Sequence, residues 1–161
     1  TEFAVEALGW NEWFASQPGG CSGHDSLARV AAVDRDQLLL VGTSGSFRAK
    51  LPGRFLHEAE ETSLRPCVGD WVCVDKSSDD EFAMVRATLD RKTCLRRKAP
   101  GDPVRYQIIA ANVDFVVVVQ SCHYDFSLKR LERYLVMVQD GGAAPLILLT
   151  KIDLMSADLT T

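Results

Sequence analysis

Residues 144–153 read Ala-Pro-Leu-Ile-Leu-Leu-Thr-Lys-Ile-Asp, a short apolar run that passes directly into a polar turn. The run predicts a buried strand, and the turn has the chemistry needed to bind guanine. An ionised Asp153 can accept hydrogen bonds from N1–H and from the exocyclic amine of guanine, whereas adenine has an acceptor at N1. Lys151 can lay its alkyl stem along the base, and Thr150 begins the turn with a hydroxyl. Ligands of open α/β sheets bind beyond the carboxyl ends of the strands, so the position favours a guanine nucleotide, GTP or GDP.

The tetrapeptide alone is also compatible with an ordinary turn, in which the lysine is solvated and the aspartate caps a helix. An Asn- or Thr-Lys-x-Asp sequence arises by chance in roughly one chain in twenty of this length. Thr150, Lys151 and Asp153 are therefore assigned to the guanine base only together with the context of the whole chain.

The residues before this strand predict one strand–helix–strand unit. Residues 115–119 are a phenylalanine and four valines, a run typical of a parallel strand covered on both faces. Apolar residues at positions 128, 131, 135 and 138 predict a helix over residues 127–139, which Asp140-Gly141-Gly142 ends. Two parallel strands with one helix cannot cover both faces of a sheet, so this domain looks incomplete.

The first half of the chain predicts a small barrel. Five short stretches rich in β-branched or aromatic residues are separated by Gly, Asp or Ser clusters. They are residues 27–33, 37–41, 47–51, 71–74 and 82–89. Five strands favour an OB-fold over an SH3-like barrel, because the OB-fold is a common five-stranded barrel that binds oligonucleotides. Residues 42–46 lack the Gly-Lys-Ser/Thr ending of a phosphate-binding loop and predict a hairpin turn, and residues 77–81 predict a solvated turn.

The predicted domain organisation has three parts. Residues 1–24 comprise a short helix, over residues 1–14, that docks on a neighbour, and a linker that begins with Gln-Pro-Gly-Gly. Residues 25–99 form the OB-fold barrel, and residues 106–161 form the first part of an α/β domain. Pro and Gly residues within 98–105 mark the linker between them. The expected fold class is therefore α+β, an all-β barrel followed by the start of an α/β domain.

Composition is that of an ordinary soluble protein of 161 residues, 47% of them hydrophobic and 25% charged. No apolar run is long enough to span a membrane, and no signal peptide is visible, so a cytoplasmic protein is expected. Five scattered cysteines without a Cys-x-x-Cys pair predict free thiols, with neither a disulfide framework nor a zinc site. The three histidines lack ligand neighbours and are assigned no chemistry.

Basic residues concentrate in one segment. Residues 86–105 carry seven basic and two acidic side chains, although the whole chain has a net charge of −4. Such a segment on an acidic chain points to a polyanionic partner such as RNA, although a solvated linker flank is the alternative. Trp71 and Phe82 are possible stacking faces for bases if exposed, and core residues otherwise. The candidate phosphate contacts are Arg86, Arg91, Lys92, Arg96, Arg97 and Lys98.

Several stretches, taken in order, resemble the ribosome small-subunit-dependent GTPase A family, RsgA or YjeQ. The resemblance covers nearly the whole chain. It rests on residues 68–72 (Val-Gly-Asp-Trp-Val), 91–98 (Arg-Lys-Thr-Cys-Leu-Arg-Arg-Lys), 107–114 (Gln-Ile-Ile-Ala-Ala-Asn-Val-Asp), 130–135 (Arg-Leu-Glu-Arg-Tyr-Leu) and 150–154 (Thr-Lys-Ile-Asp-Leu).

The resemblance implies an OB-fold followed by a circularly permuted GTPase domain, in which the guanine motif precedes the phosphate-binding loop, and a final zinc-binding domain. It implies that this chain is a fragment, and that Mg²⁺ and structural Zn²⁺ belong only to the full-length protein. The small ribosomal subunit and its rRNA are the implied partners, in late maturation of that subunit, and a monomer is expected. The family usually has Asn at the position of Thr150, so contacts made by that carboxamide are in doubt.

GTP hydrolysis needs phosphate-cradling amides, a phosphate-binding lysine, a Mg²⁺ ligand and a means of placing water. No such set is visible, so no catalytic residue is named and the 161-residue chain alone is predicted not to hydrolyse GTP. Gln107, Asn112 and Asp114 are interpreted as turn and capping residues. The main alternative is a non-enzymatic OB-fold RNA-binding module, and a plain α/β enzyme fragment using Lys151 and Asp153 ranks last.

Overall fold

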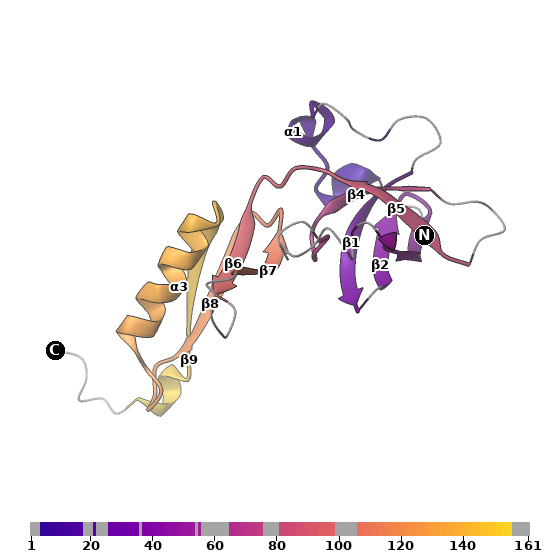
Figure 1. Ribbon diagram of the computed structural model, residues 1–161. Helices are drawn as coiled ribbons and strands as arrows, with labels where there is room; N and C mark the ends of the chain where they lie inside the picture. The colour runs from indigo at the N-terminus through magenta and orange to yellow at the C-terminus, as the bar shows by residue number, and fades with distance from the viewer. Residues whose placement is uncertain are drawn as a thin grey trace.

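A closed barrel of five strands makes up the first half of the computed structural model (Figure 1). The structure describes residues 4–17, 21, 26–35, 37–53, 55, 65–75, 81–98 and 106–155. The barrel strands are β1 (Ser26–Asp34), β2 (Gln37–Gly42), β3 (Gly45–Lys50), β4 (Trp71–Asp75) and β5 (Ala83–Thr88). Their order is β1-β2-β3-β5-β4, with β3 and β5 parallel and the other neighbours antiparallel. The expected five-stranded OB-like barrel is confirmed. The β2–β3 hairpin turns at residues 43–44, within the predicted range 42–46.

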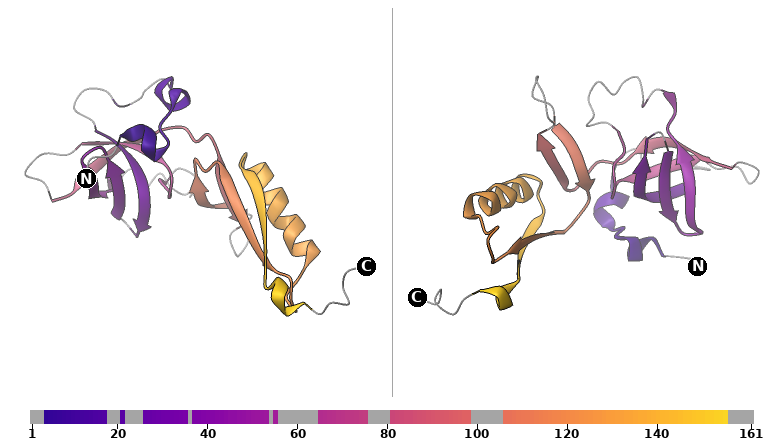
Figure 2. Two further views of the ribbon diagram at one scale, coloured as in Figure 1. Left: turned by 180° about the vertical axis from the view of Figure 1, so that it is seen from behind. Right: turned by 90° about the horizontal axis from the view of Figure 1, so that it is seen from below.

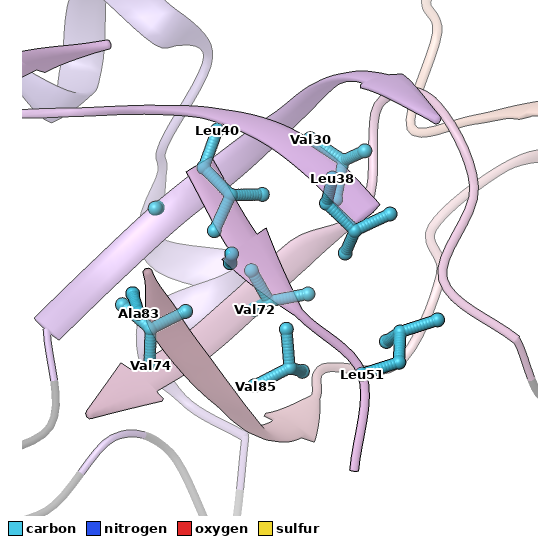
Figure 3. Close-up of a cluster of buried hydrophobic side chains, with 10 residues drawn as sticks. Val30, Leu38, Leu40, Leu51, Val72, Val74, Ala83 and Val85 are labelled. Carbon is cyan, nitrogen blue, oxygen red and sulfur yellow. The ribbon is translucent and has the colours of Figure 1, made fainter. Parts of the chain in front are cut away.

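The barrel core follows from the two-residue period of its strands. Along β2, Leu38 and Leu40 point inward and are fully buried, while Leu39 between them is exposed. Figure 3 shows these leucines facing Val72, Val74 and other apolar side chains from the remaining strands. In β4 the residues of both faces are buried, because its outer face is also covered.

A short N-terminal cap, defined here as residues 5–15, covers that outer face. The expected single helix is wrong: the cap consists of a 3-10 turn, η1 (Val5–Leu8), and a short helix, α1 (Glu12–Ala15). Gly9, which has a φ of 93°, ends η1 and separates it from α1. The Asn11 side chain caps α1 by accepting a hydrogen bond from the Trp13 N–H at 3.0 Å. The predicted docking on a neighbour is confirmed, because Trp10 and Phe14 pack on Trp71.

Two of the five cysteines form a disulfide, Cys21–Cys73, which corrects the expectation that all five are free thiols. The bond joins positions 52 residues apart, so the sequence holds no short cysteine spacing that could have predicted it. Cys67, Cys94 and Cys122 are free, as expected.

The next two strands form a separate antiparallel hairpin, β6 (Cys94–Lys98) and β7 (Tyr106–Ala111). Lys98 pairs with Tyr106, and residues 99–105, most of the expected linker, lie outside the described residues. The expected turn at residues 77–81 also lies almost wholly outside them. The predicted boundaries of the domains stay predictions.

The last part is the expected strand–helix–strand unit: β8 (Phe115–Ser121), α3 (Leu128–Asp140) and β9 (Ala144–Thr150), followed by a 3-10 turn, η2 (Ile152–Leu154). The two strands are parallel and in register from Phe115 and Ala144 to Ser121 and Thr150. Helix α3 covers one face, as Figure 2 shows, and buries Leu131 and Val138 against Val118.

The second face of β8 is uncovered among the described residues, in agreement with the expectation that one helix cannot cover both faces of the sheet, although the apolar run itself is typical of a strand covered on both. Phe115, Val117 and Val119 on the other face are 64%, 52% and 61% exposed. Leu128, expected in the apolar stripe of the helix, is also exposed. No helix in the described ranges is long and apolar enough to cross a membrane.

Candidate functional site

The Thr-Lys-Ile-Asp turn leaves the sheet at the edge where both parallel strands end (Figure 1). Thr150 is the last residue of β9, and its hydroxyl donates to the Gln120 carbonyl of β8 at 3.4 Å. The Thr150 carbonyl in turn accepts from the Cys122 N–H at 2.9 Å. Thr150 therefore anchors the turn to the neighbouring strand through both its side chain and its backbone.

Lys151 redirects the chain away from the sheet. Its backbone is left-handed, with φ 59° and ψ 34°, which is uncommon for a residue other than glycine. The 3-10 turn η2 follows directly, and the side chains of Lys151 and Asp153 are exposed. The structure thus presents the lysine and the aspartate at the carboxyl edge of the sheet, where ligands of α/β folds bind.

The loop after β8 flanks this turn. Gln120, 4% exposed, donates through Nε2 to the Asp125 carbonyl at 3.4 Å. Arg130 of α3 forms an ion pair with the Asp125 carboxylate at 3.1 Å. The bond from Arg130 is the main cause that holds the pKa of Asp125 below its usual value, and the charge of Lys151 acts in the same direction. The loop therefore places a carboxylate within electrostatic range of Lys151 and ties it to the start of α3.

Three of the predicted RNA contacts lie together on the β6–β7 hairpin. Arg96, Arg97 and Lys98 are exposed on β6. Arg97 donates from Nε and Nη2 to Oε1 of Gln107, at 3.3 and 3.1 Å, so Gln107 supports a basic side chain across the hairpin. The Arg96 guanidinium lies 5.0 Å from the ring centroid of Tyr106.

Tyr106 is an aromatic residue that the sequence reasoning did not select. It is 50% exposed, pairs with Lys98 and lies against the Arg96 guanidinium on the same face of the hairpin. The signal that could have found it is its position in the sequence, directly after the basic segment 86–105.

The other predicted contacts lie apart from this group. Arg86 on β5 forms an ion pair with Asp75, and Lys92 is exposed between β5 and β6. Arg91 is bound to Asp70, whose side chain is fully buried. The structure therefore does not bring the six basic residues onto one surface.

Neither aromatic residue proposed for stacking is freely exposed. Trp71 is fully buried beneath the N-terminal cap and is a core residue. The ring of Phe82 is half-buried, and the Lys50 ammonium lies 4.1 Å from its centroid. The interpretation of Trp71 as a core residue is the correct one.

A junction joins the barrel to the hairpin, and sequence reasoning missed how it is built. Gly69, with a φ of 91°, brings the turn before β4 so close to β7 that an added Cβ would lie 2.0 Å from the Ala111 carbonyl oxygen. Asn112, also left-handed, donates from Nδ2 to the Gly69 carbonyl at 3.2 Å and accepts from the Lys92 N–H at 2.8 Å. Asn112 is thus a turn residue, as interpreted.

Arg29 completes this junction. Its guanidinium donates to the carbonyls of Gly69 at 3.2 Å and Asn112 at 2.6 Å, and to the Leu8 carbonyl of the cap. Burial lowers the pKa of Arg29, against the opposing charges of Asp114 and Asp70. One arginine therefore connects the cap, the barrel and the end of the hairpin.

Comparison with known proteins identifies relatives over most of the chain. The family model described as RsgA GTPase matches residues 88–161. Similar curated proteins include the small ribosomal subunit biogenesis GTPase RsgA of Syntrophotalea carbinolica, 37% identical over 93% of this chain and 43% of the relative. RsgA 2 of Listeria monocytogenes is 40% identical over 97% of this chain and 42% of the relative. The chain thus spans about two fifths of the length of these relatives.

Two solved structures share the fold. The crystal structure of YloQ, described as a circularly permuted GTPase, superposes with a TM-score of 0.60 at 22% identity, over 88% of this chain and 46% of that chain. YjeQ from Thermotoga maritima superposes with a TM-score of 0.61 at 21% identity, over 83% and 44%. The barrel, the hairpin and the strand–helix–strand unit therefore have counterparts among solved folds.

Proposed function

Because the chain belongs to the RsgA/YjeQ family of circularly permuted GTPases, we propose that it supplies the guanine-binding turn and an RNA-binding surface to a cytoplasmic GTPase of small-subunit biogenesis. The ligands are GTP and GDP, and the partner is the maturing small ribosomal subunit with its rRNA. The protein acts as a monomer.

The observation that carries the proposal is the position of Lys151 and Asp153 just beyond the carboxyl end of β9, beside the end of β8. An exposed carboxylate there can accept both guanine hydrogen bonds, and the lysine stem can cover one face of the base. Thr150 uses its hydroxyl to hold the turn on β8. Recognition of the base therefore falls to Lys151 and Asp153, and Thr150 positions them.

The RNA-binding surface is centred on the hairpin. Arg96, Arg97 and Lys98 present three positive charges on one short strand, and phosphate contacts of this kind supply most of the non-specific affinity for RNA. Arg86 and Lys92 are also exposed, but they lie apart from this surface and would contact phosphates separately. Arg91 serves the fold instead, because its guanidinium is committed to the buried Asp70.

Among the residues that the structure describes, no three His, Cys, Asp or Glu side chains are grouped so as to hold a metal ion. Mg²⁺ and structural Zn²⁺ remain expectations for the full-length protein. The prediction that the 161-residue chain alone does not hydrolyse GTP is tested by Mg²⁺-dependent phosphate release from the purified chain.

The deciding experiment is calorimetric titration of the full-length gene product with GDP and with ADP. The Asp153→Asn variant should lose GDP affinity, and Glu132→Gln, which removes an exposed carboxylate on α3, should not. Tight GDP binding that ADP does not match, lost only in Asp153→Asn, supports the proposal. Equal binding of GDP and ADP to the wild type refutes it. Equal GDP binding by Asp153→Asn and Glu132→Gln also refutes it.

A further inference from the structure

We propose that Cys21 and Cys73 form a reversible modification site, a thiol–disulfide pair that exchanges with small disulfides of the glutathione class and locks the N-terminal cap onto the barrel. The inference concerns the barrel alone and rests on neither nucleotide nor RNA binding. It starts from the bond in the structure, which joins Cα atoms 5.3 Å apart across a separation of 52 residues.

Non-covalent contacts bring the two sulfurs together before any bond forms. Trp10 and Phe14 of the cap pack on Trp71, two residues before Cys73 in β4, with ring centroids 5.0 and 6.1 Å away. Gln17 then fixes the chain beyond α1, because its side chain donates to the Asp90 carbonyl at 3.2 Å and accepts from the Asp90 N–H at 2.8 Å. The chain is thus held on both sides of the helix, four residues before Cys21 in the sequence.

The two cysteines differ in access, and this difference sets the order of the chemistry. Cys73 is 2% exposed, in a cluster with Phe14, Trp71 and Leu89, whereas Cys21 is partly exposed. Of these two cysteines, only Cys21 can be reached by a dissolved disulfide. The remaining free cysteines lie elsewhere, and burial raises the pKa of Cys67 to about 12, which removes that thiol from competition.

The exchange proceeds in two displacements. The Cys21 thiolate attacks oxidised glutathione, forms a mixed disulfide and releases one glutathione thiolate. The Cys73 thiolate then attacks the Cys21 sulfur and releases the second. Two protein thiols and one small disulfide become one protein disulfide and two small thiols, so no further oxidant is needed. Disulfides are rare and transient in reducing compartments. A bond that forms by exchange through one accessible cysteine can therefore act as a reversible switch.

Locking the cap has a structural consequence beyond the barrel. The cap presents the Leu8 carbonyl to Arg29, which also holds Gly69 and Asn112 at the junction with the hairpin. Oxidation should therefore restrict the opening of the cap and hold the junction in place. Reduction should leave packing, the Arg29 bond to Leu8 and the Gln17 hydrogen bonds to hold the cap.

The test is treatment of the native full-length protein with oxidised glutathione, then acid quenching, alkylation of remaining thiols with N-ethylmaleimide and peptide mapping. Wild type should yield a Cys21–Cys73 linked peptide. Cys73→Ser should accumulate glutathione on Cys21, and Cys21→Ser should leave Cys73 unmodified. Cys122→Ser, a half-buried cysteine far along the chain, is the matched control and should form the link normally.

Hydrogen exchange supplies a second measurement on wild type alone, so the proposal stays testable if a variant fails to fold. Amides of residues 5–15 should exchange about ten times more slowly in the oxidised than in the reduced protein, because the bond restricts opening of the cap. Absence of the linked peptide, glutathione on Cys73 in Cys21→Ser, or equal exchange in both redox states would overturn the proposal.

Discussion

The Arg91 guanidinium donates to both carboxylate oxygens of Asp70, from Nε to Oδ1 at 2.8 Å and from Nη2 to Oδ2 at 2.7 Å. Asp70 is fully buried and also accepts from the Cys67 N–H at 2.8 Å. Burial disfavours the charge on Arg91, but its bonds to Asp70 outweigh that effect and raise the pKa of Arg91 above its usual value. Asp70 and Arg91 both belong to the stretches that resemble the RsgA family. Together they form an internal ion pair.

Replacing Asp70 with Asn should strongly destabilise the fold. The change leaves a largely buried guanidinium without its counter-charge, for which losses of about 3–5 kcal/mol are typical. Asp75→Asn is the matched control, because it breaks the exposed Arg86–Asp75 pair, a type that contributes about 1 kcal/mol or less. Urea unfolding of both variants measures the difference, and equal losses would contradict an internal structural role for Asp70.

The close approach at Gly69 should make Gly69→Ala far more damaging than Gly142→Ala. Both glycines have a positive φ, so each substitution carries backbone strain of about 1 kcal/mol. Only at Gly69 would the new Cβ also meet the Ala111 carbonyl oxygen at 2.0 Å, while the nearest atom at Gly142 is 3.7 Å away. Urea unfolding should therefore show an additional loss of about 2 kcal/mol or more for Gly69→Ala. Similar losses in the two variants would show that the barrel and hairpin separate easily.

Periodicity was sufficient to predict the five barrel strands and the strand–helix–strand unit, but it did not predict β6 and β7 as a separate hairpin. Alternation along β2 and the continuous apolar run of β8 depend on neighbouring residues only, so the strands were predicted nearly at their observed bounds. The same holds for α3, where Ser127 accepts the Arg130 N–H at the predicted start of the helix. The cap was predicted less well, because Gly9 adopts a left-handed conformation that a pattern of apolar residues does not reveal.

Long-range pairings account for what the sequence did not predict. The bond between Cys21 and Cys73, and the contacts of Arg29 with Leu8 and Asn112, join positions far apart in the chain. The same limitation applies to Arg91, which begins the basic stretch 91–98 while its partner Asp70 lies 21 residues earlier. Local charge therefore identified a basic segment correctly but could not separate the arginine that supports the fold from those that face solvent.

Cys67 should resist alkylation in the folded protein. Burial is the main cause that raises the pKa of its thiol to about 12, from a usual value of 9.0, with Asp70 adding to the effect. At pH 8.5 iodoacetamide should therefore modify it about a hundred times more slowly than in urea-unfolded protein, as peptide mapping would measure. Because the folded state favours the neutral thiol, this stabilisation is complete below pH 9 and is lost as the pH rises toward 12. Equal rates in folded and unfolded protein would contradict the burial of this thiol.

Removing charge from the hairpin should weaken RNA binding in a salt-dependent way. In an Arg97→Gln, Lys98→Gln double variant, the slope of log affinity against log salt for small-subunit rRNA should become shallower by about 1.5–2, because two phosphate contacts are lost. Lys129→Gln and Arg133→Gln together remove the same charge from the exposed side of α3 and serve as the control. Filter binding across a salt series measures both slopes, and equal changes would mean that only net charge matters.

Replacing the carboxylate of residue 153 with a carboxamide should change the preferred base from guanine to xanthine. Asp153→Asn replaces one acceptor oxygen with an NH₂ donor, which faces the exocyclic amine of guanine and removes that bond, while the N1–H can still be accepted. Loss of a charged hydrogen bond should weaken GDP binding by about 2 kcal/mol, roughly thirtyfold. Xanthine carries a carbonyl where guanine carries the amine, so XDP should bind the variant more tightly than it binds wild type. Competition titration of the full-length protein with both nucleotides measures this reversal. A variant that loses GDP without gaining XDP would show that Asp153 supports the turn but does not contact the base, because a misplaced turn weakens both nucleotides alike.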